Sequence, residues 1–73
     1  MRVTINGQAC DVPDGATLED ALRHVGVDPS ARGIAVARAE TGEELAVVRR
    51  ADWAATRLVA DDRVEVVTAT QGG

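Results

Sequence analysis

The residues of this chain whose types and spacing could do chemistry are the last three, Gln71, Gly72 and Gly73. Glycine has no side chain to pack and loses the most backbone entropy on ordering, so a glycine pair adds nothing to a fold here. The pair is useful where a C-terminus must pass through a narrow channel and present its carboxylate to a reagent. Taken alone, two terminal glycines are better explained as a frayed chain end, so the rest of the sequence has to decide.

Cys10 and His24 are the other residues that could take part in chemistry. Cys10 falls on the apolar face of an expected strand, where cysteine usually acts as a small hydrophobe, so we reject it as a reactive sulfur site. His24 falls late in an expected helix, where the helix dipole stabilises a positive, solvated imidazole. No Cys or His is near His24 in the sequence, so we expect no metal site. We also expect no catalytic residue and no bound cofactor in this chain.

Arg49, Arg50 and Trp53 form the remaining group of interest. We interpret the two arginines as a solvated pair, with partner docking as the less favoured interpretation. Trp53 is the single tryptophan of a chain that has no Phe and no Tyr. We expect it to be a packing anchor at the edge of a core built from Val, Ile, Leu and Ala.

Size and charge restrict the classes of function. A chain of 73 residues is enough for one domain, which leaves little room for a walled active site, so we predict that it is not an enzyme. The net charge of −4 argues against nucleic acid and anionic membranes and suits a partner with a basic docking face. One cysteine excludes an intramolecular disulfide. No apolar stretch reaches membrane-spanning length, so we expect a cytoplasmic location.

The first half of the chain predicts a hairpin followed by a helix. Residues 2–5 alternate polar and β-branched side chains, and Asn6-Gly7 is the preferred pair for a type I′ turn into a return strand at residues 8–12. Thr17 is a good helix N-cap, with Asp20 as its capping-box partner. Gly26 fits the position just past the helix end.

The second half predicts three more strands. Residues 33–37 are apolar on both faces and are predicted to form a central strand; residues 39–44 form a polar loop, and residues 45–48 a short strand. Residues 49–56 suggest an irregular or single helical turn, and Asp61-Asp62 a tight turn into a last strand from Arg63. The strand and helix periods place one set of apolar residues on shared faces, and we predict that this set forms the core: Val3, Ile5, Val12, Leu18, Leu22, Val25, Ile34, Val36, Val64 and Val66.

This order of elements predicts an α+β fold in which one main helix covers a mixed sheet, with a strand after the helix running parallel to the first. We expect a single domain over residues 1–73. Residues 70–73 offer no apolar anchor and are predicted to form a mobile diglycine tail.

In the order and spacing of its short motifs, the sequence resembles the ThiS family of thiamine-pathway sulfur carriers, which have the ubiquitin-like β-grasp fold. The resemblance covers essentially the whole chain and is carried by the order and spacing of short motifs. These are Val3-Thr4-Ile5-Asn6-Gly7, Pro13-Asp14-Gly15-Ala16-Thr17-Leu18, Gly33-Ile34-Ala35-Val36-Ala37, Arg50-Ala51-Asp52-Trp53-Ala54, and Asp62-Arg63-Val64-Glu65-Val66-Val67-Thr68-Ala69 followed by Gln71-Gly72-Gly73.

The resemblance implies a carrier and not a catalyst. In the family an E1-like adenylyltransferase of the ThiF type, which consumes ATP, adenylates the terminal carboxylate. A sulfur donor protein or sulfide then converts the adenylate to a thiocarboxylate, which supplies sulfur to a ThiG-type thiazole synthase. Carried over to this chain, Gly73 is the modified residue, and Gly72 and Gln71 thread into the activating enzyme.

Three alternatives stay open. The chain could be a sister carrier on the same fold, serving molybdopterin synthesis or sulfide delivery to cysteine or methionine synthesis. It could be a ubiquitin-like modifier that uses the same adenylate to form an isopeptide bond. It could also be a plain binding module whose diglycine is incidental.

Overall fold

A computed structural model of the chain describes residues 1–69, and the predicted mobile tail at residues 70–73 lies outside these described residues. The elements are β1 (Arg2–Ile5), β2 (Gln8–Asp11), α1 (Leu18–His24), β3 (Ile34–Ala39), β4 (Ala46–Val48), a 3-10 turn η1 (Arg50–Asp52) and β5 (Arg63–Thr68). Within residues 1–69, no helix is both long enough and apolar enough to cross a bilayer.

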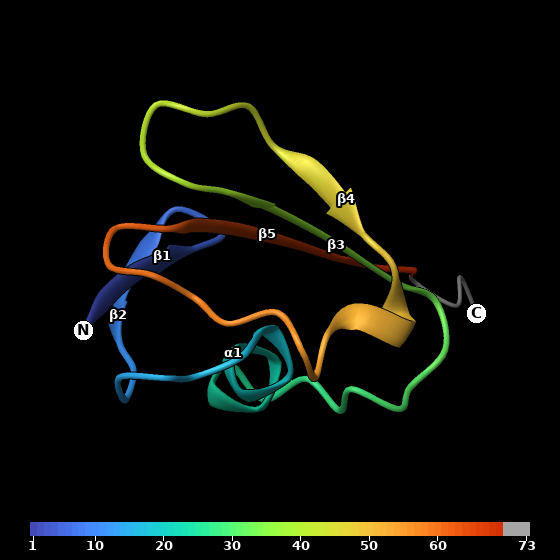
Figure 1. Cartoon of the computed structure of the whole chain (residues 1–73). Helices are drawn as coiled ribbons and strands as arrows, with labels where there is room; N and C mark the ends of the chain where they lie inside the picture. Colours follow the sequence, from blue (N-terminus) through green and yellow to red (C-terminus); the bar gives the residue numbers. More distant parts are fainter. Residues whose placement is uncertain (70–73) are drawn as a thin grey trace.

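The strands form one mixed sheet in the order β2-β1-β5-β3-β4. The last strand, β5, pairs in parallel with β1 and antiparallel with β3, and the hairpin strand β2 and the short strand β4 form the edges. Helix α1 lies against one face of this sheet, and within residues 1–69 no helix covers the opposite face (Figure 1). The predicted α+β arrangement, with the strand after the helix parallel to the first, is confirmed.

The turn between β1 and β2 has a second task besides reversing the chain. Asn6 and Gly7 both have positive φ, 50° and 82°, as the predicted type I′ turn requires. The Asn6 side chain then reaches β5, where its Oδ1 accepts from the Val66 N–H at 2.7 Å and its Nδ2 donates to the Val66 carbonyl at 3.2 Å. The pairing of β1 with β5 ends at Ile5, so the Asn6 amide continues the hydrogen bonding along β5 where the β1 backbone has turned away.

Replacing Asn6 with glycine should therefore destabilise the protein although the turn itself is preserved. Asn6→Gly keeps the positive φ and removes both hydrogen bonds to Val66, which should cost about 1–3 kcal/mol of unfolding free energy. Asn6→Asp keeps the acceptor for the Val66 N–H and loses the donor, so it should have an intermediate effect. Urea denaturation of the three proteins tests this; equal stability of Asn6→Gly and the parent would show that the amide only serves the turn.

Both ends of α1 follow from local sequence. The Thr17 hydroxyl accepts from the Asp20 N–H, and the Asp20 carboxylate accepts from the Thr17 N–H, which is the predicted capping box. The Thr17 N–H is the main cause that lowers the pKa of Asp20. At the other end Gly26 has a φ of 80° and donates to the Arg23 carbonyl, as predicted for the position after the helix.

The prediction that Val25 belongs to the core is wrong, because its side chain is 39% exposed. The helix ends at His24, and the chain leaves it in a Schellman motif in which the Val27 N–H donates to the Leu22 carbonyl at 2.9 Å. This motif commonly places the residue after the glycine against the last apolar turn of the helix. Val27 accordingly packs against the core in the place predicted for Val25.

The core lies between the sheet and α1, and its composition otherwise follows the prediction. Ile34 is half-buried and packs against it, whereas the buried members are Val3, Ile5, Val12, Ala16, Leu18, Ala21, Leu22, Val36, Trp53, Leu58, Val64 and Val66. Trp53 belongs to the core itself and not to its edge. Its indole N–H donates to the Val48 carbonyl at 2.8 Å, which satisfies the one polar atom of a buried side chain.

Strand β3 lies between β5 and β4, so its predicted central position in the sheet is confirmed. Described residues cover only one of its faces: Val36 is buried, whereas Ala35 is exposed and Ala37 is half-buried. With a single helix in the described residues, the sheet has one layer against it, so small apolar residues of β3 face outward.

Candidate functional site

The predicted site residues, Gln71, Gly72 and Gly73, lie outside the described residues, so the structure describes the surface from which they continue. That surface is the end of β5. Strand β5 pairs with β1 at Arg63 and Val64 and with β3 from Arg63 to Thr68, and its Val64 and Val66 side chains enter the core. The strand is therefore held by β3 along its whole length, up to Thr68.

Ala69, the last described residue, is held by the segment that leads into β3. Its N–H donates to the Gly33 carbonyl at 2.6 Å. Gly33 has a φ of 77°, and a Cβ added there would lie 2.9 Å from the Ala69 Cβ, closer than side-chain atoms can approach. Glycine is thus required at residue 33 both for backbone conformation and for the close approach of Ala69.

Arg50 is exposed, as predicted, but its guanidinium is bound to other parts of the protein. Its guanidinium donates to the backbone carbonyls of Pro29 and Ala31, and it lies over the Trp53 ring, 4.7 Å from the ring centroid. Arg49 is exposed as well, and its side chain makes a long contact of 3.4 Å to Asp52. The two arginines are adjacent in the sequence, but only Arg50 connects η1 to the segment before β3.

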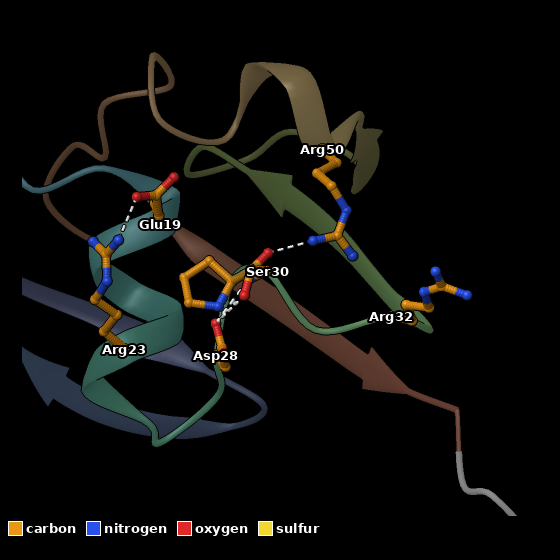
Figure 2. A pocket seen from close by; sticks show the side chains of 7 residues that line it. Glu19, Arg23, Asp28, Ser30, Arg32 and Arg50 are labelled. Carbon is orange, nitrogen blue, oxygen red and sulfur yellow. Dashed lines mark hydrogen bonds and ion pairs between the residues drawn. The ribbon is translucent and has the colours of Figure 1, made fainter.

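A shallow hollow opens between α1, η1 and this segment, and charged side chains line it (Figure 2). Glu19 and Arg23 of α1 form an ion pair at one side, and Arg50 reaches across from η1. The Ser30 N–H and hydroxyl both donate to Asp28 and lower the pKa of its carboxyl group. Among the charged groups of the hollow, Glu19 and Arg23 form an ion pair with each other, whereas Arg32 has no ionic partner within residues 1–69.

The uncovered face of the sheet carries an apolar patch next to β5. Ala35 pairs with Val67 and Ala37 with Val47, and these four residues point away from the core, since their neighbours Val36 and Val66 point into it. Val47 and Val67 are 79% and 64% exposed. This open-face patch, defined as Ala35, Ala37, Val47 and Val67, runs along the strand that leads to the C-terminal residues, and exposed apolar patches often mark interaction sites.

Cys10 and His24 lie away from the end of β5. Cys10 pairs with Val3 at the far edge of the sheet, is half-buried, and packs against the core. His24 is exposed in the last turn of α1. Within residues 1–69, no three His, Cys, Asp or Glu side chains are grouped so that they could hold a metal ion.

Comparison with known proteins identifies the family. The model of the ThiS family matches residues 3–73. The chain belongs to the ThiS family. Among solved structures it is similar to the crystal structure of the thiamine biosynthesis protein (ThiS) from Geobacter metallireducens, with 27% sequence identity, a TM-score of 0.71 and 100% of each chain covered. No curated protein matches the sequence.

The ThiS fold confirms the β-grasp prediction and shows what the resembling motifs do. The motif from Arg50 to Ala54 supplies the buried Trp53 and the Arg50 guanidinium that binds the segment before β3. The motif from Asp62 to Ala69 contains β5. Sequence reasoning missed the contact of Gly33 with Ala69 and the open-face patch. The positive-φ preference of glycine was a signal for the first, and the alternation of Val66 and Val67 in β5 was a signal for the second.

Proposed function

We propose that this protein is a sulfur carrier of thiamine biosynthesis and that the Gly73 carboxylate carries the sulfur. The observation that supports this most strongly is the ThiS family match, which extends through Gly72 and Gly73 at the end of the chain. The described fold agrees with it, because β5 carries the chain out of the core and ends at Thr68, five residues before Gly73 in the sequence. We further propose that the protein has no catalytic residue and binds no cofactor.

The chemistry follows from the poor reactivity of a carboxylate, which is anionic and has no leaving group. An E1-like adenylyltransferase of the ThiF type would join a Gly73 carboxylate oxygen to the α-phosphorus of ATP, and pyrophosphate would leave. A sulfide-level sulfur, from sulfide or a donor protein, would then attack the acyl carbon, and AMP would leave as the new C–S bond forms. The resulting thiocarboxylate would supply the sulfur to a ThiG-type thiazole synthase.

Intact-mass measurement after incubation with ATP, an activating enzyme and sulfide tests the proposal. A thiocarboxylate raises the mass of the chain by the difference between sulfur and oxygen. An isopeptide product with another protein would instead indicate a ubiquitin-like modifier, and an unchanged mass would indicate a binding module. Supplying the product to thiazole, molybdopterin and cysteine or methionine synthesis enzymes then separates the sister pathways.

The open-face patch is the surface that we propose for docking of the activating enzyme. Val67→Gln should raise the KM for the carrier in adenylation by about tenfold, as for the loss of one buried apolar contact at an interface. The melting temperature should change little, because Val67 points away from the core. Val59→Gln is the matched control, since Val59 is also exposed but precedes the start of β5. Equal effects of the two substitutions would exclude this face as the docking site.

Cys10 should carry none of the transferred sulfur. It packs against the core at the far edge of the sheet, so Cys10→Ala removes the thiol without burying a new polar group. The amount of thiocarboxylate formed, measured by intact mass, should equal that of the parent protein, with a loss of stability of at most about 1–2 kcal/mol from the smaller side chain. Loss of sulfur loading in a variant that remains folded would assign Cys10 a role in the transfer.

A further inference from the structure

We infer that Arg50 is a positioning residue for the C-terminal tail, acting through residues 29–33 and Gly33 on Ala69. The consequence for adenylation rests on the proposed function, whereas the structural part does not. The segment in question joins α1 to β3 and lies at the end of the molecule where β5 finishes (Figure 1).

Residues 29–33 belong to no helix or strand. Within the segment, the Ser30 N–H bonds to the Asp28 carboxylate and the Ala31 N–H to the Asp28 carbonyl, and both contacts are local. Ser30, Ala31, Arg32 and Gly33 are all exposed. A segment with so little of its own hydrogen bonding and packing has low local stability, so its position depends on contacts from outside.

Besides its junction with β3, where Ile34 pairs with Thr68, two contacts with backbone atoms hold this segment. At one end Arg50 reaches toward the segment from η1 (Figure 2), and its guanidinium donates to the Pro29 and Ala31 carbonyls. Hydrogen bonds from a charged donor are stronger than neutral ones, and a planar guanidinium can hold two acceptors in fixed directions. At the other end the Gly33 carbonyl accepts from the Ala69 N–H.

Arg50 can act as a fixed point because it is itself held by the core. Its guanidinium lies over the Trp53 ring, and Trp53 is 2% exposed and bonded to the Val48 carbonyl. A continuous series of contacts therefore runs from the core through Arg50 to the segment, and from Gly33 to Ala69. Ala69, two residues before Gln71, is therefore a held point from which the tail continues. Holding this point lowers the entropy lost when a tail enters a site and aligns with a reagent.

A different use of the same region has to be distinguished, namely a basic surface that attracts an acidic partner. Arg32 provides the matched control, since it lies in the same segment and lines the same hollow but makes no hydrogen bond or ion pair within residues 1–69. Arg32→Met and Arg50→Met remove the same charge from the same end of the molecule. Only Arg50→Met removes the two contacts with the carbonyls.

Amide hydrogen exchange in the free protein, measured by NMR, tests the structural part without any partner. Arg50→Met should speed exchange of the Ala69 amide by roughly tenfold or more, while the Asn6 amide, bonded to Val64 in the sheet, should change much less. Arg32→Met should leave both unchanged. An equal increase at Ala69 and Asn6 would mean that Arg50 only stabilises the fold, and this would overturn the inference. Should Arg50→Met not fold, Arg50→Lys keeps the charge over Trp53 and tests the loss of paired donors, with the same selective change expected at Ala69.

Steady-state adenylation of the same variants tests the functional part. Arg50→Met should lower kcat by roughly tenfold with KM within about twofold of the parent, since the open-face patch is unchanged. Equal rises of KM in Arg50→Met and Arg32→Met would show a charge-based docking surface and overturn the inference. Failure of the parent protein to be adenylated would instead reject the proposed function, and the exchange result at Ala69 would stand independently of it.

Discussion

Deletion of Gly73 should abolish adenylation while leaving the stability of the protein unchanged. The core is complete by Val66, and Gly73 has no side chain, so the unfolding free energy should change by at most about 0.5 kcal/mol, as for ordinary surface changes. The new terminal carboxylate, on Gly72, would fall short by up to about 3.3–3.6 Å, the span of one extended residue. Attack on a phosphorus atom does not tolerate a displacement of that size.

ATP–pyrophosphate exchange with the activating enzyme, together with a thermal melt, measures both halves of this expectation. Gly73→Ala is the matched control, because it keeps the length of the chain and adds one methyl group. If the narrow-channel explanation of the diglycine is right, this control should also lose much of the exchange rate. A C-terminal tag, which converts the carboxylate to an amide, should lose all of it. Exchange at the parent rate by the deletion or the tagged protein would reject the carrier function in favour of a binding module.

The parts of the fold that the sequence predicted correctly are those determined by neighbouring residues. Asn6-Gly7 forms the type I′ turn, and Thr17 with Asp20 forms the capping box, because each signal and its effect lie within four residues of each other. The prediction that Val25 belongs to the core was wrong because it extended the helical pattern past the point where the helix ends. Helical periodicity places it on the apolar stripe, but the motif around Gly26 ends the helix one residue earlier and turns Val27 inward.

Contacts between distant residues could not be predicted in this way. Asn6 was chosen from its turn propensity, and nothing near it in the sequence indicates that its amide bonds to Val66, 60 residues away. The same distinction holds for the candidate site. The last three residues suggested its reactive group, the terminal carboxylate. The contacts that hold Ala69 involve Gly33 and Arg50, which only the folded chain brings to the end of β5.

The largest stability effect should come from another long-range contact, the ion pair between Arg38 of β3 and Asp62, which precedes β5. Asp62 is 0% exposed, and its Oδ2 accepts from the Arg38 guanidinium at 2.8 Å and from the Val59 N–H at 2.8 Å. Its Oδ1 is buried and has no hydrogen-bond partner within the described residues. The carboxylate therefore depends on one guanidinium for nearly all of its charge compensation.

Arg38→Met should cost about 3–5 kcal/mol, because it leaves an uncompensated charge in the interior. For a chain of 73 residues this is a large part of a total stability of roughly 4–11 kcal/mol, so the variant should be partly unfolded at 37 °C. Arg2→Met is the matched control. Arg2 and Asp11 are both exposed and 3.9 Å apart, and pairs of this kind contribute about 0–1 kcal/mol.

A double variant separates the charge from the packing of the Arg38 side chain. Asp62→Asn removes the charge and keeps an oxygen that can accept from the Val59 N–H, so Arg38→Met with Asp62→Asn should be more stable than Arg38→Met alone. Urea denaturation of the single and double variants gives the coupling energy directly. If the double variant is no more stable than Arg38→Met, the loss comes from the packing of the arginine stem and not from the buried charge. The junction between β3 and β5 would then be held by apolar contacts, and the ion pair would contribute little to it.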